Sequence, residues 1–381
     1  MPKNPIRVVV EGAYWMKEIE LKMQGKISRL TNHTFKFDER IRDGWFSAVY
    51  FLKTRELVKK YHEDNMITMQ FFQKDEAVLC GTDEVIALVK TFADNPEELE
   101  IYSLKDGERI APFETVLTIT GPYQNFGYLE GIIDGILARR TSVSTNVYNV
   151  VKAASYSGEQ KPVIFMGDRD DHYTTQAGDG YAAYIGGATA QATHAMNEWW
   201  GKQGMGTMPH ALIQLFNGDI VAATHAYHET FPNDDLIALV DYNNDAVTDS
   251  LKVAREFGEK LKGVRVDTSR TMIDQYFLRN QHLLGTFDPR GVNAELIFAL
   301  RKALDDEGFN HVKIVVSGGF SENRILNFEK HNVPVDMYGV GGSLLKLTIG
   351  FTGDNVMLNG KHEAKSGRKF RPNPRLEKVE C

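Results

Sequence analysis

From Val163 onward, short apolar runs alternate with segments whose apolar residues recur at helical spacing. The runs are "VIFMG", "LIALVD", "GVRVD", "VKIVVSGG" and "VDMYGVGG", and the helical segments between them are residues 190–200, 246–261, 292–304 and 321–330. Nearly continuous apolar strands separated by helices predict parallel strands covered by helices. The pattern favours a (β/α) barrel over an open doubly wound sheet, although it is compatible with both.

The chain before about residue 160 is patterned differently. Strands are predicted at residues 6–10, 66–72, 98–103 and 115–120, mixed with helices in no regular order. Apolar residues between Phe126 and Leu137 recur at helical spacing after the turn signal "TGPY". This arrangement indicates an α+β domain. After Gly350 the sequence is typical of a short hairpin with a basic tail, which is expected to return to that first domain.

Composition and charge narrow the class of protein. A chain of 381 residues that is 42% apolar can bury a large core and is long enough for two or three domains. Its formal charge of −7, with no long basic run before the last twenty residues, argues against nucleic acid as a partner. The only cysteines, Cys80 and Cys381, suit a reducing compartment. No apolar run approaches the roughly 18 residues of a membrane span, so we expect a cytoplasmic protein.

Two glycine pairs follow predicted strands. Gly318 and Gly319 end "VKIVVSGG" just before Ser321, a predicted helix N-cap, and "YGVGGS" repeats the pattern with Gly341, Gly342 and Ser343. Glycines let backbone N–H groups approach phosphate oxygens, and a helix N-terminus favours an anion. Either pair alone is explained better by a simple chain turn. Two pairs on consecutive strand ends favour a phosphate site.

Charged residues end the neighbouring strands. Asp241 ends "LIALVD" and Asp267 ends "GVRVD", while Arg265 lies two residues before Asp267 and therefore on the same face. This set suits a ribose hydroxyl, a phosphate, or Mg²⁺ bound through substrate phosphates, with Asp241 as the candidate metal contact. A structural ion pair is an equally good interpretation.

One histidine of the eleven lies in a promising context. His210 in "GMGTMPHALI" follows a proline and a Gly-Thr turn, which places it in a loop or a first helical turn. An accessible imidazole there can act as a general base or a nucleophile. Thr207 offers a hydroxyl to a ligand or caps the turn.

Taken in order, "GTMPHAL", "VRVDT", "KIVVSGGF" and "YGVGGSL" resemble the nicotinate phosphoribosyltransferases, relatives of the nicotinamide and quinolinate phosphoribosyltransferases. "AVYFLKT", "GPYQNFGYLEG" and "AYIGGA" extend the resemblance over about residues 40–370. It implies an α/β fold with a sandwich domain at residues 1–135, an irregular TIM-like barrel at 136–347, and a segment at 348–381 that returns to the sandwich. It also implies a homodimer or higher homo-oligomer with active sites at the subunit interface.

The resemblance further implies a reaction and residue roles. Nicotinate and phosphoribosyl pyrophosphate, both small molecules, would give nicotinate mononucleotide and pyrophosphate for NAD synthesis, with Mg²⁺ as cofactor and ATP as co-substrate. Arg265 and Asp267 would contact the base and the phosphoribosyl group, and Thr207 would lie near nicotinate. His210 matches the histidine that ATP phosphorylates. Tyr50 would stack on the pyridine ring from the neighbouring subunit. The ribose 5-phosphate would be held by Gly318, Gly319, Gly341 and Gly342, with Ser343 in place of a lost threonine hydroxyl.

The segment "FMGDRDDHY" departs from the family pattern Phe-Gly-x-Arg-Arg. Met166 stands where the family has the stacking Phe, although Phe165 is adjacent, and Arg169 is kept. Asp170 replaces the second Arg, which weakens the case for a carboxylate substrate if Asp170 faces that substrate. Ala188 stands where the nicotinamide-specific relatives have an Asp, which favours nicotinate. Arg139 and Arg140 either supply the positive charge that is lost with the second Arg or lie at a solvated helix end. The alternatives are a nicotinamide or quinolinate phosphoribosyltransferase, and an inactive phosphate-binding homologue with a regulatory role.

Overall fold

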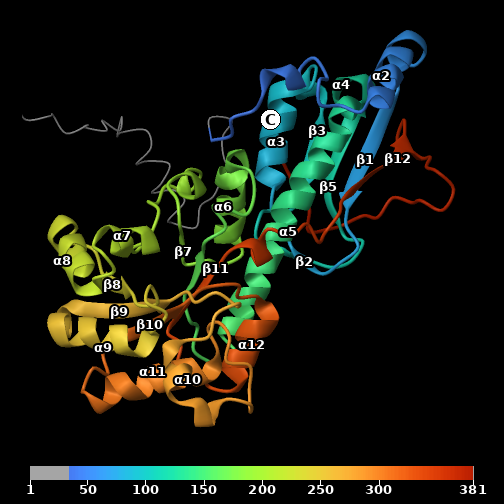
Figure 1. Ribbon diagram of the computed structural model, residues 1–381. Helices are drawn as coiled ribbons and strands as arrows, with labels where there is room; N and C mark the ends of the chain where they lie inside the picture. Colours follow the sequence, from blue (N-terminus) through green and yellow to red (C-terminus); the bar gives the residue numbers. More distant parts are fainter. Residues whose placement is uncertain (1–33, 381) are drawn as a thin grey trace, which may run out of the picture. The chain divides into compact units, whose positions relative to one another are not determined.

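The structure, a computed structural model, describes residues 34–380 and divides into two compact units (Figure 1). The sandwich unit comprises residues 34–142, Asn197–Gln203 and 347–380, and the barrel unit comprises Val143–Met196 and Gly204–Lys346. The chain passes from the first to the second within helix α5 (Glu130–Ala154). The strand predicted at residues 6–10 lies outside the described residues.

The sandwich unit contains a six-stranded antiparallel sheet in the order β13-β12-β1-β5-β3-β14. The strands are β1 (Met66–Phe72), β3 (Glu100–Ser103), β5 (Thr115–Pro122), β12 (Thr352–Leu358), β13 (Lys361–His362) and β14 (Glu377–Lys378). β2 (Ala77–Val78) and β4 (Arg109–Ile110) form a separate pair. The hairpin predicted after Gly350 is confirmed, since β12 pairs with β13. β12 also pairs with β1, so the C-terminal segment supplies one of the two strands that flank β1, the other being β5.

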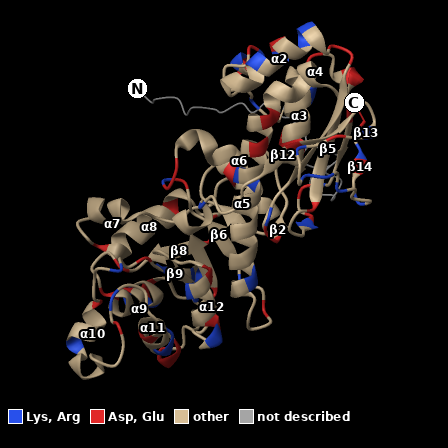
Figure 2. Ribbon diagram, turned by 90° about the vertical axis from the view of Figure 1, so that its right-hand side faces the viewer, with Lys and Arg blue, Asp and Glu red and all other residues tan. Residues whose placement is uncertain are grey.

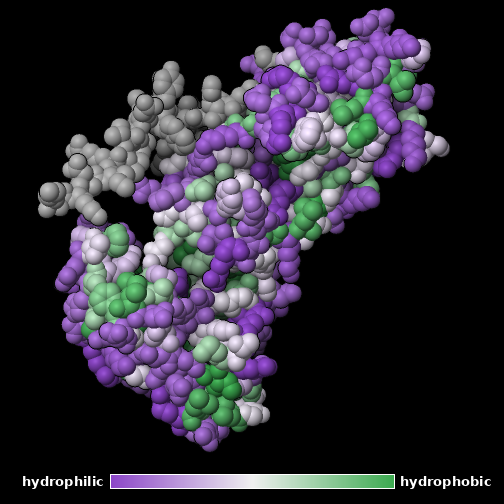
Figure 3. Space-filling model, turned by 45° about the horizontal axis from the view of Figure 1, so that its top comes forward, coloured by the Kyte–Doolittle hydropathy of each residue, from purple (hydrophilic) through white to green (hydrophobic). Residues whose placement is uncertain are grey.

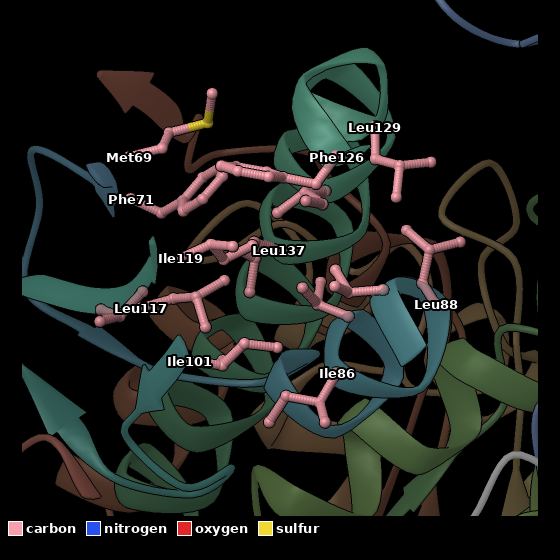
Figure 4. Packing of buried hydrophobic residues seen from close by; sticks show 14 of the residues in the cluster. Met69, Phe71, Ile86, Leu88, Ile101, Leu117, Ile119, Phe126, Leu129 and Leu137 are labelled. Carbon is pink, nitrogen blue, oxygen red and sulfur yellow. The ribbon is translucent and has the colours of Figure 1, made fainter. Parts of the chain in front are cut away.

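Helices cover this sheet and close its core. They are α2 (Val49–Tyr61), α3 (Thr82–Phe92), α4 (Tyr123–Phe126) and the first part of α5. Figure 4 shows Met69, Phe71, Leu117 and Ile119 of the sheet packed with Phe126, Leu129 and Leu137. The helical periodicity read from "TGPYQNFGYLEG" onward is confirmed, because these three residues are fully buried. Each buried Leu or Phe contributes about 1.5–3 kcal/mol, so this stripe is what holds α5 on the sheet.

The barrel unit contains six parallel strands in the order β7-β6-β11-β10-β9-β8. They are β6 (Val163–Phe165), β7 (Ala190–Gln191), β8 (Leu236–Leu239), β9 (Leu261–Val266), β10 (Lys313–Val316) and β11 (Met337–Val340). Strands that follow one another in the chain are neighbours, except β7 and β8, and the last strand, β11, pairs with the first, β6. This is the strand order of a barrel that is not closed between β7 and β8. A doubly wound sheet would instead reverse its strand order in the middle. The predicted α/β barrel class is confirmed, as an incomplete barrel.

Helices follow the strands. They are α6 (Gln176–Ile185), α7 (His210–Leu215), α8 (Ile220–Thr230), α9 (Ala246–Phe257), α10 (Gln275–Arg279), α11 (Ala294–Asp306) and α12 (Glu322–Lys330). α9, α11 and α12 confirm three predicted helices. α9 packs on β9 and between α8 and α11.

The helix predicted at residues 190–200 is wrong. Residues 190 and 191 form strand β7 beside β6, and only Ala195–Asn197 make a single 3-10 turn. The Thr193 hydroxyl accepts a hydrogen bond from the N–H of Met196, which offers the backbone an alternative to a helical bond. Met196, Trp199 and Trp200 are buried, so the apolar spacing reflects burial without a helix.

The surface is mixed in charge. Lysines and arginines are interspersed with aspartates and glutamates (Figure 2), and hydrophilic residues cover most of the face in Figure 3. None of the helices in residues 34–380 is both long and apolar enough to cross a membrane. Cys80 is fully buried.

Candidate functional site

A cavity of about 740 Å³ opens where the parallel strands of the barrel unit end. The carboxyl ends of parallel strands meet at one edge of a sheet, so residues that follow β6, β9, β10 and β11 converge there. Nine of the predicted site residues line this strand-end cavity: Met166, Arg169, Arg265, Asp267, Gly318, Gly319, Gly341, Gly342 and Ser343. Thr207, His210 and Asp241 also belong to the barrel unit, but they do not line the strand-end cavity.

The first glycine pair has a conformation that glycine favours. Gly318 and Gly319 have φ of +90° and +70°, and a Cβ on Gly318 would lie 3.3 Å from Asp267 Oδ1. The backbone N–H groups of Gly318, Gly319 and Phe320 find no acceptor among the described residues. Ser321 is the N-cap residue of α12 and its side chain makes no capping hydrogen bond. Three N–H groups without acceptors at a cavity wall suit an anionic ligand.

The second glycine pair is covered by a carboxylate. Cβ atoms on Gly341 and Gly342 would lie 2.7 Å and 2.8 Å from the two carboxylate oxygens of Asp170. Asp170 therefore faces the site and lies against the backbone where a phosphate was expected. A negative charge there repels a second anion. The role of Gly341 and Gly342 in phosphate binding stays a prediction.

His210, Asp241 and Asp267 form a connected network. His210 begins α7, and its Nε2 lies 3.1 Å from Asp241 Oδ1. Asp241 Oδ2 accepts from the N–H of Asp267 at 3.1 Å and from the Thr268 hydroxyl at 3.4 Å. The hydrogen bond to Asp241 raises the pKa of His210 above its usual value. Side-chain exposure is 46% for His210 and 3% for Asp241, so the histidine is accessible and the aspartate orients it.

This geometry changes the role expected for Asp241. Both of its oxygens accept hydrogen bonds and its side chain is buried, so Asp241 is engaged in orienting its neighbours, and its contact with a metal stays a prediction. No group of three or more His, Cys, Asp or Glu side chains among residues 34–380 is arranged to hold a metal ion. Mg²⁺ held mainly by substrate phosphates needs only one or two carboxylates, and Asp168 and Asp267 line the cavity.

Two polar side-chain atoms near the cavity are buried without partners. Arg265 donates from Nη2 to the carbonyl of Met208 at 3.2 Å, but its Nε has no acceptor. The Thr207 hydroxyl is likewise unpaired. Buried polar atoms nearly always find partners in folded proteins. These two exceptions suit a ligand that supplies the missing hydrogen bonds.

Further cationic residues at the cavity were missed in the sequence. Arg270 lines it three residues after Asp267 and donates to the carbonyl of Gly319, and Lys346 lines it three residues after Ser343. Their short distance from the strand ends is a signal that could have identified them. Arg324 in α12, also missed, lines a neighbouring cavity.

Other predicted residues lie in the sandwich unit. Tyr50 is in α2, 65% exposed, with its ring 4.3 Å from that of Phe51. Its stacking role across a subunit interface stays a prediction. Arg140 pairs with Glu84 at 2.7 Å, with the two side chains only 13% and 10% exposed. Arg140 therefore belongs to a partly buried ion pair. It is neither a solvated residue at a helix end nor a free cation that could bind the pyridine substrate.

Several known proteins are similar to this chain in sequence. A family model described as "Quinolinate phosphoribosyl transferase, N-terminal domain" matches residues 48–141. The chain is 27% identical over 252 residues to a nicotinate phosphoribosyltransferase of Bacillus subtilis (strain 168), over 64% of this chain and 45% of that protein. One from Mycobacterium tuberculosis (strain CDC 1551 / Oshkosh) is 25% identical over 249 residues, over 65% and 48% of the two chains. The chain spans about half the length of these relatives.

Solved structures share the fold. A nicotinate-nucleotide pyrophosphorylase from Pyrococcus furiosus aligns with a TM-score of 0.74 and 28% identity, over 91% of this chain and 85% of that one. Human nicotinic acid phosphoribosyltransferase aligns with a TM-score of 0.63 and 15% identity, over 83% and 75%, which shows the fold alone. The resemblance to the nicotinate phosphoribosyltransferase family is confirmed.

Proposed function

Because the chain is related to the nicotinate phosphoribosyltransferases, we propose that it joins nicotinate to phosphoribosyl pyrophosphate, giving nicotinate mononucleotide and pyrophosphate for NAD synthesis. The observation that most supports this is the strand-end cavity, where N–H groups without acceptors at Gly318–Gly319 adjoin Arg265 and Asp267. An anionic donor and a carboxylate-bearing base both find partners there.

The reaction needs electrostatic stabilisation of its transition state and does not need a general base to remove a proton. The pyridine nitrogen forms a bond to the anomeric carbon while the bond to pyrophosphate breaks, and the nitrogen has no proton to lose. Positive charge grows on the ribose, where the Asp267 carboxylate stabilises it, and negative charge grows on the leaving group, where Arg270 and Lys346 stabilise it. Arg265 binds the carboxylate of nicotinate. Mg²⁺ carried by the donor, with Asp168 and Asp267 as its protein ligands, would add positive charge at the leaving group.

His210 is proposed to accept a phosphoryl group from ATP. In the neutral tautomer that donates Nε2–H to Asp241, the lone pair lies on Nδ1, which makes Nδ1 the nucleophilic atom. Its accessibility and the buried, orienting carboxylate support this assignment. We also propose that the protein is a homodimer in which Tyr50 of one copy reaches the cavity of the other.

A comparison of three bases tests the proposal. Nicotinate, nicotinamide and quinolinate are each supplied with phosphoribosyl pyrophosphate and Mg²⁺, and pyrophosphate and mononucleotide are measured. Nicotinate is expected to react fastest. Turnover of nicotinamide alone would overturn the proposal, and binding of the donor without turnover of any base would indicate an inactive homologue.

Quinolinate is the second candidate. The family model over residues 48–141 is that of a quinolinate enzyme, and four cationic side chains line the cavity, Arg169, Arg265, Arg270 and Lys346. A base with two carboxylates would use more of them. Release of CO₂ together with pyrophosphate would identify this reaction.

A further inference from the structure

Arg324 lies behind the first glycine pair and binds its carbonyl oxygens. Its Nη1 donates to the carbonyl of Gly318 at 2.8 Å and to that of Gly319 at 3.2 Å, and its Nη2 donates to the carbonyl of Val292. The guanidinium stacks on the Phe320 ring at 4.2 Å. No carboxylate in residues 34–380 pairs with Arg324, so its positive charge is not neutralised.

The planar trans peptide fixes where the opposite atoms point. The carbonyl of Gly318 and the N–H of Gly319 belong to one peptide group and point in opposite directions, as do the carbonyl of Gly319 and the N–H of Phe320. Gly318, Gly319 and Phe320 line the strand-end cavity, whereas Arg324 lines a neighbouring cavity of about 760 Å³. Holding both carbonyls on the Arg324 side therefore turns both N–H groups toward the ligand side.

We propose that Arg324 is a positioning residue that fixes the N–H groups of Gly319 and Phe320 for anion binding and adds positive charge behind them. The inference rests on the proposed function for the identity of the anion, a phosphate of the donor substrate. It also explains why the two glycine pairs differ. Arg324 and Arg270 make the first pair favourable for an anion, while Asp170 makes the second pair unfavourable.

Because both glycines have positive φ, their peptide groups have few steric restraints of their own. Without the guanidinium, the Gly318 carbonyl loses its donor, so its peptide group can rotate and turn that oxygen toward the ligand. The Gly319 carbonyl keeps the hydrogen bond from Arg270. The effect should therefore appear in the binding of the anion and not in the binding of the base.

The test compares Arg324→Met and Arg324→Lys with a matched control, Arg290→Met. Arg290 lines the neighbouring cavity but pairs with Asp288 at 2.8 Å. Calorimetry measures the binding of ribose 5-phosphate and of phosphoribosyl pyrophosphate, steady-state kinetics give KM for each substrate, and thermal melting monitors the fold. Arg324→Met is expected to weaken both anionic ligands about 10- to 100-fold, the loss typical of hydrogen bonds to a charged group. KM for the base should not change.

Arg324→Lys should recover only part of the loss, because a single ammonium cannot reproduce the fork that spans two carbonyls. The control should bind like the unaltered protein. Anion binding within twofold of the unaltered protein in both Arg324 variants would overturn the proposal, as would an equal rise in both KM values with a lowered melting temperature. If the unaltered protein binds ribose 5-phosphate but turns over no pyridine, the proposed function fails while the Arg324 comparison still decides this inference.

Discussion

Replacing Glu130 with Gln should stabilise the sandwich unit at alkaline pH. Glu130 begins α5 beside Gly353, and no described residue donates a hydrogen bond to its carboxylate. Burial, followed by the charges of Asp134 and Asp354, raises its pKa from 4.5 to about 7. The unfolded chain loses this proton near its ordinary pKa while the folded protein still holds it. The contribution of Glu130 to the free energy of unfolding is therefore greatest at low pH and falls as pH rises from about 4.5 to 7.

The magnitude follows from the shift. One pKa unit corresponds to about 1.4 kcal/mol, which gives an upper limit of about 3 kcal/mol for the shift of Glu130. The side chain is partly exposed and solvent screens its charge, so we expect about 1–2 kcal/mol. In a unit of this size that is a rise in melting temperature of about 2–8 °C for Glu130→Gln at pH 8.

The assay is thermal melting of both proteins from pH 5.5 to 8.5, with Glu76→Gln as control, since the Glu76 side chain is 78% exposed. The gain of Glu130→Gln should shrink toward pH 5.5, where the unfolded carboxylate is close to its own pKa. Asp134, whose pKa burial raises to about 6, is present in both proteins, and its repulsion of Glu130 is part of the expected gain. Melting temperatures that stay a constant distance apart over the whole range would refute the reasoning.

Four further outcomes are expected. His210→Ala should abolish ATP stimulation and leave slow ATP-independent transfer, and unchanged coupling would remove the histidine from the mechanism. Asp241→Asn should lower the pKa of His210, because the hydrogen bond to Asp241 raises it, and proton NMR of the imidazole would detect this. Gly318→Ala should raise KM for the donor more than Gly285→Ala does, since both have positive φ but only Gly318 has close neighbours. Glu329→Gln should cost about 3–5 kcal/mol in unfolding experiments, because it leaves Lys161 partly buried without its partner carboxylate.

The strand ends could be predicted from sequence because parallel strands are nearly all apolar and stop abruptly at polar residues. By that rule Arg265, Asp267 and both glycine pairs fall at one edge of the sheet. Contacts between distant residues could not be predicted in this way. The His210–Asp241 pair joins residues 31 positions apart, and the bonds from Arg324 to Gly318 and Gly319 depend on the direction of two peptide groups.

Asp170 shows the other limit of a sequence motif. The motif "FMGDRDDHY" marks it as a departure from the family pattern, but only the structure shows its carboxylate against Gly341 and Gly342. The helix wrongly predicted at residues 190–200 has a similar cause. Apolar spacing reports which residues are buried, and a Thr hydroxyl that bonds to the backbone can direct the same residues into a turn.

The pairing of β1 with β12 has a consequence for synthesis of the chain. Ile67 pairs with Leu358, so β1 emerges from the ribosome long before its partner strand, and the whole barrel unit is made in between. Until then β1 presents an open edge to other nascent chains, a known route to aggregation. A protein truncated near Gly350 would keep that edge permanently. Production of this protein should therefore depend on chaperones and on slow, cool expression more than the mostly hydrophilic face in Figure 3 suggests.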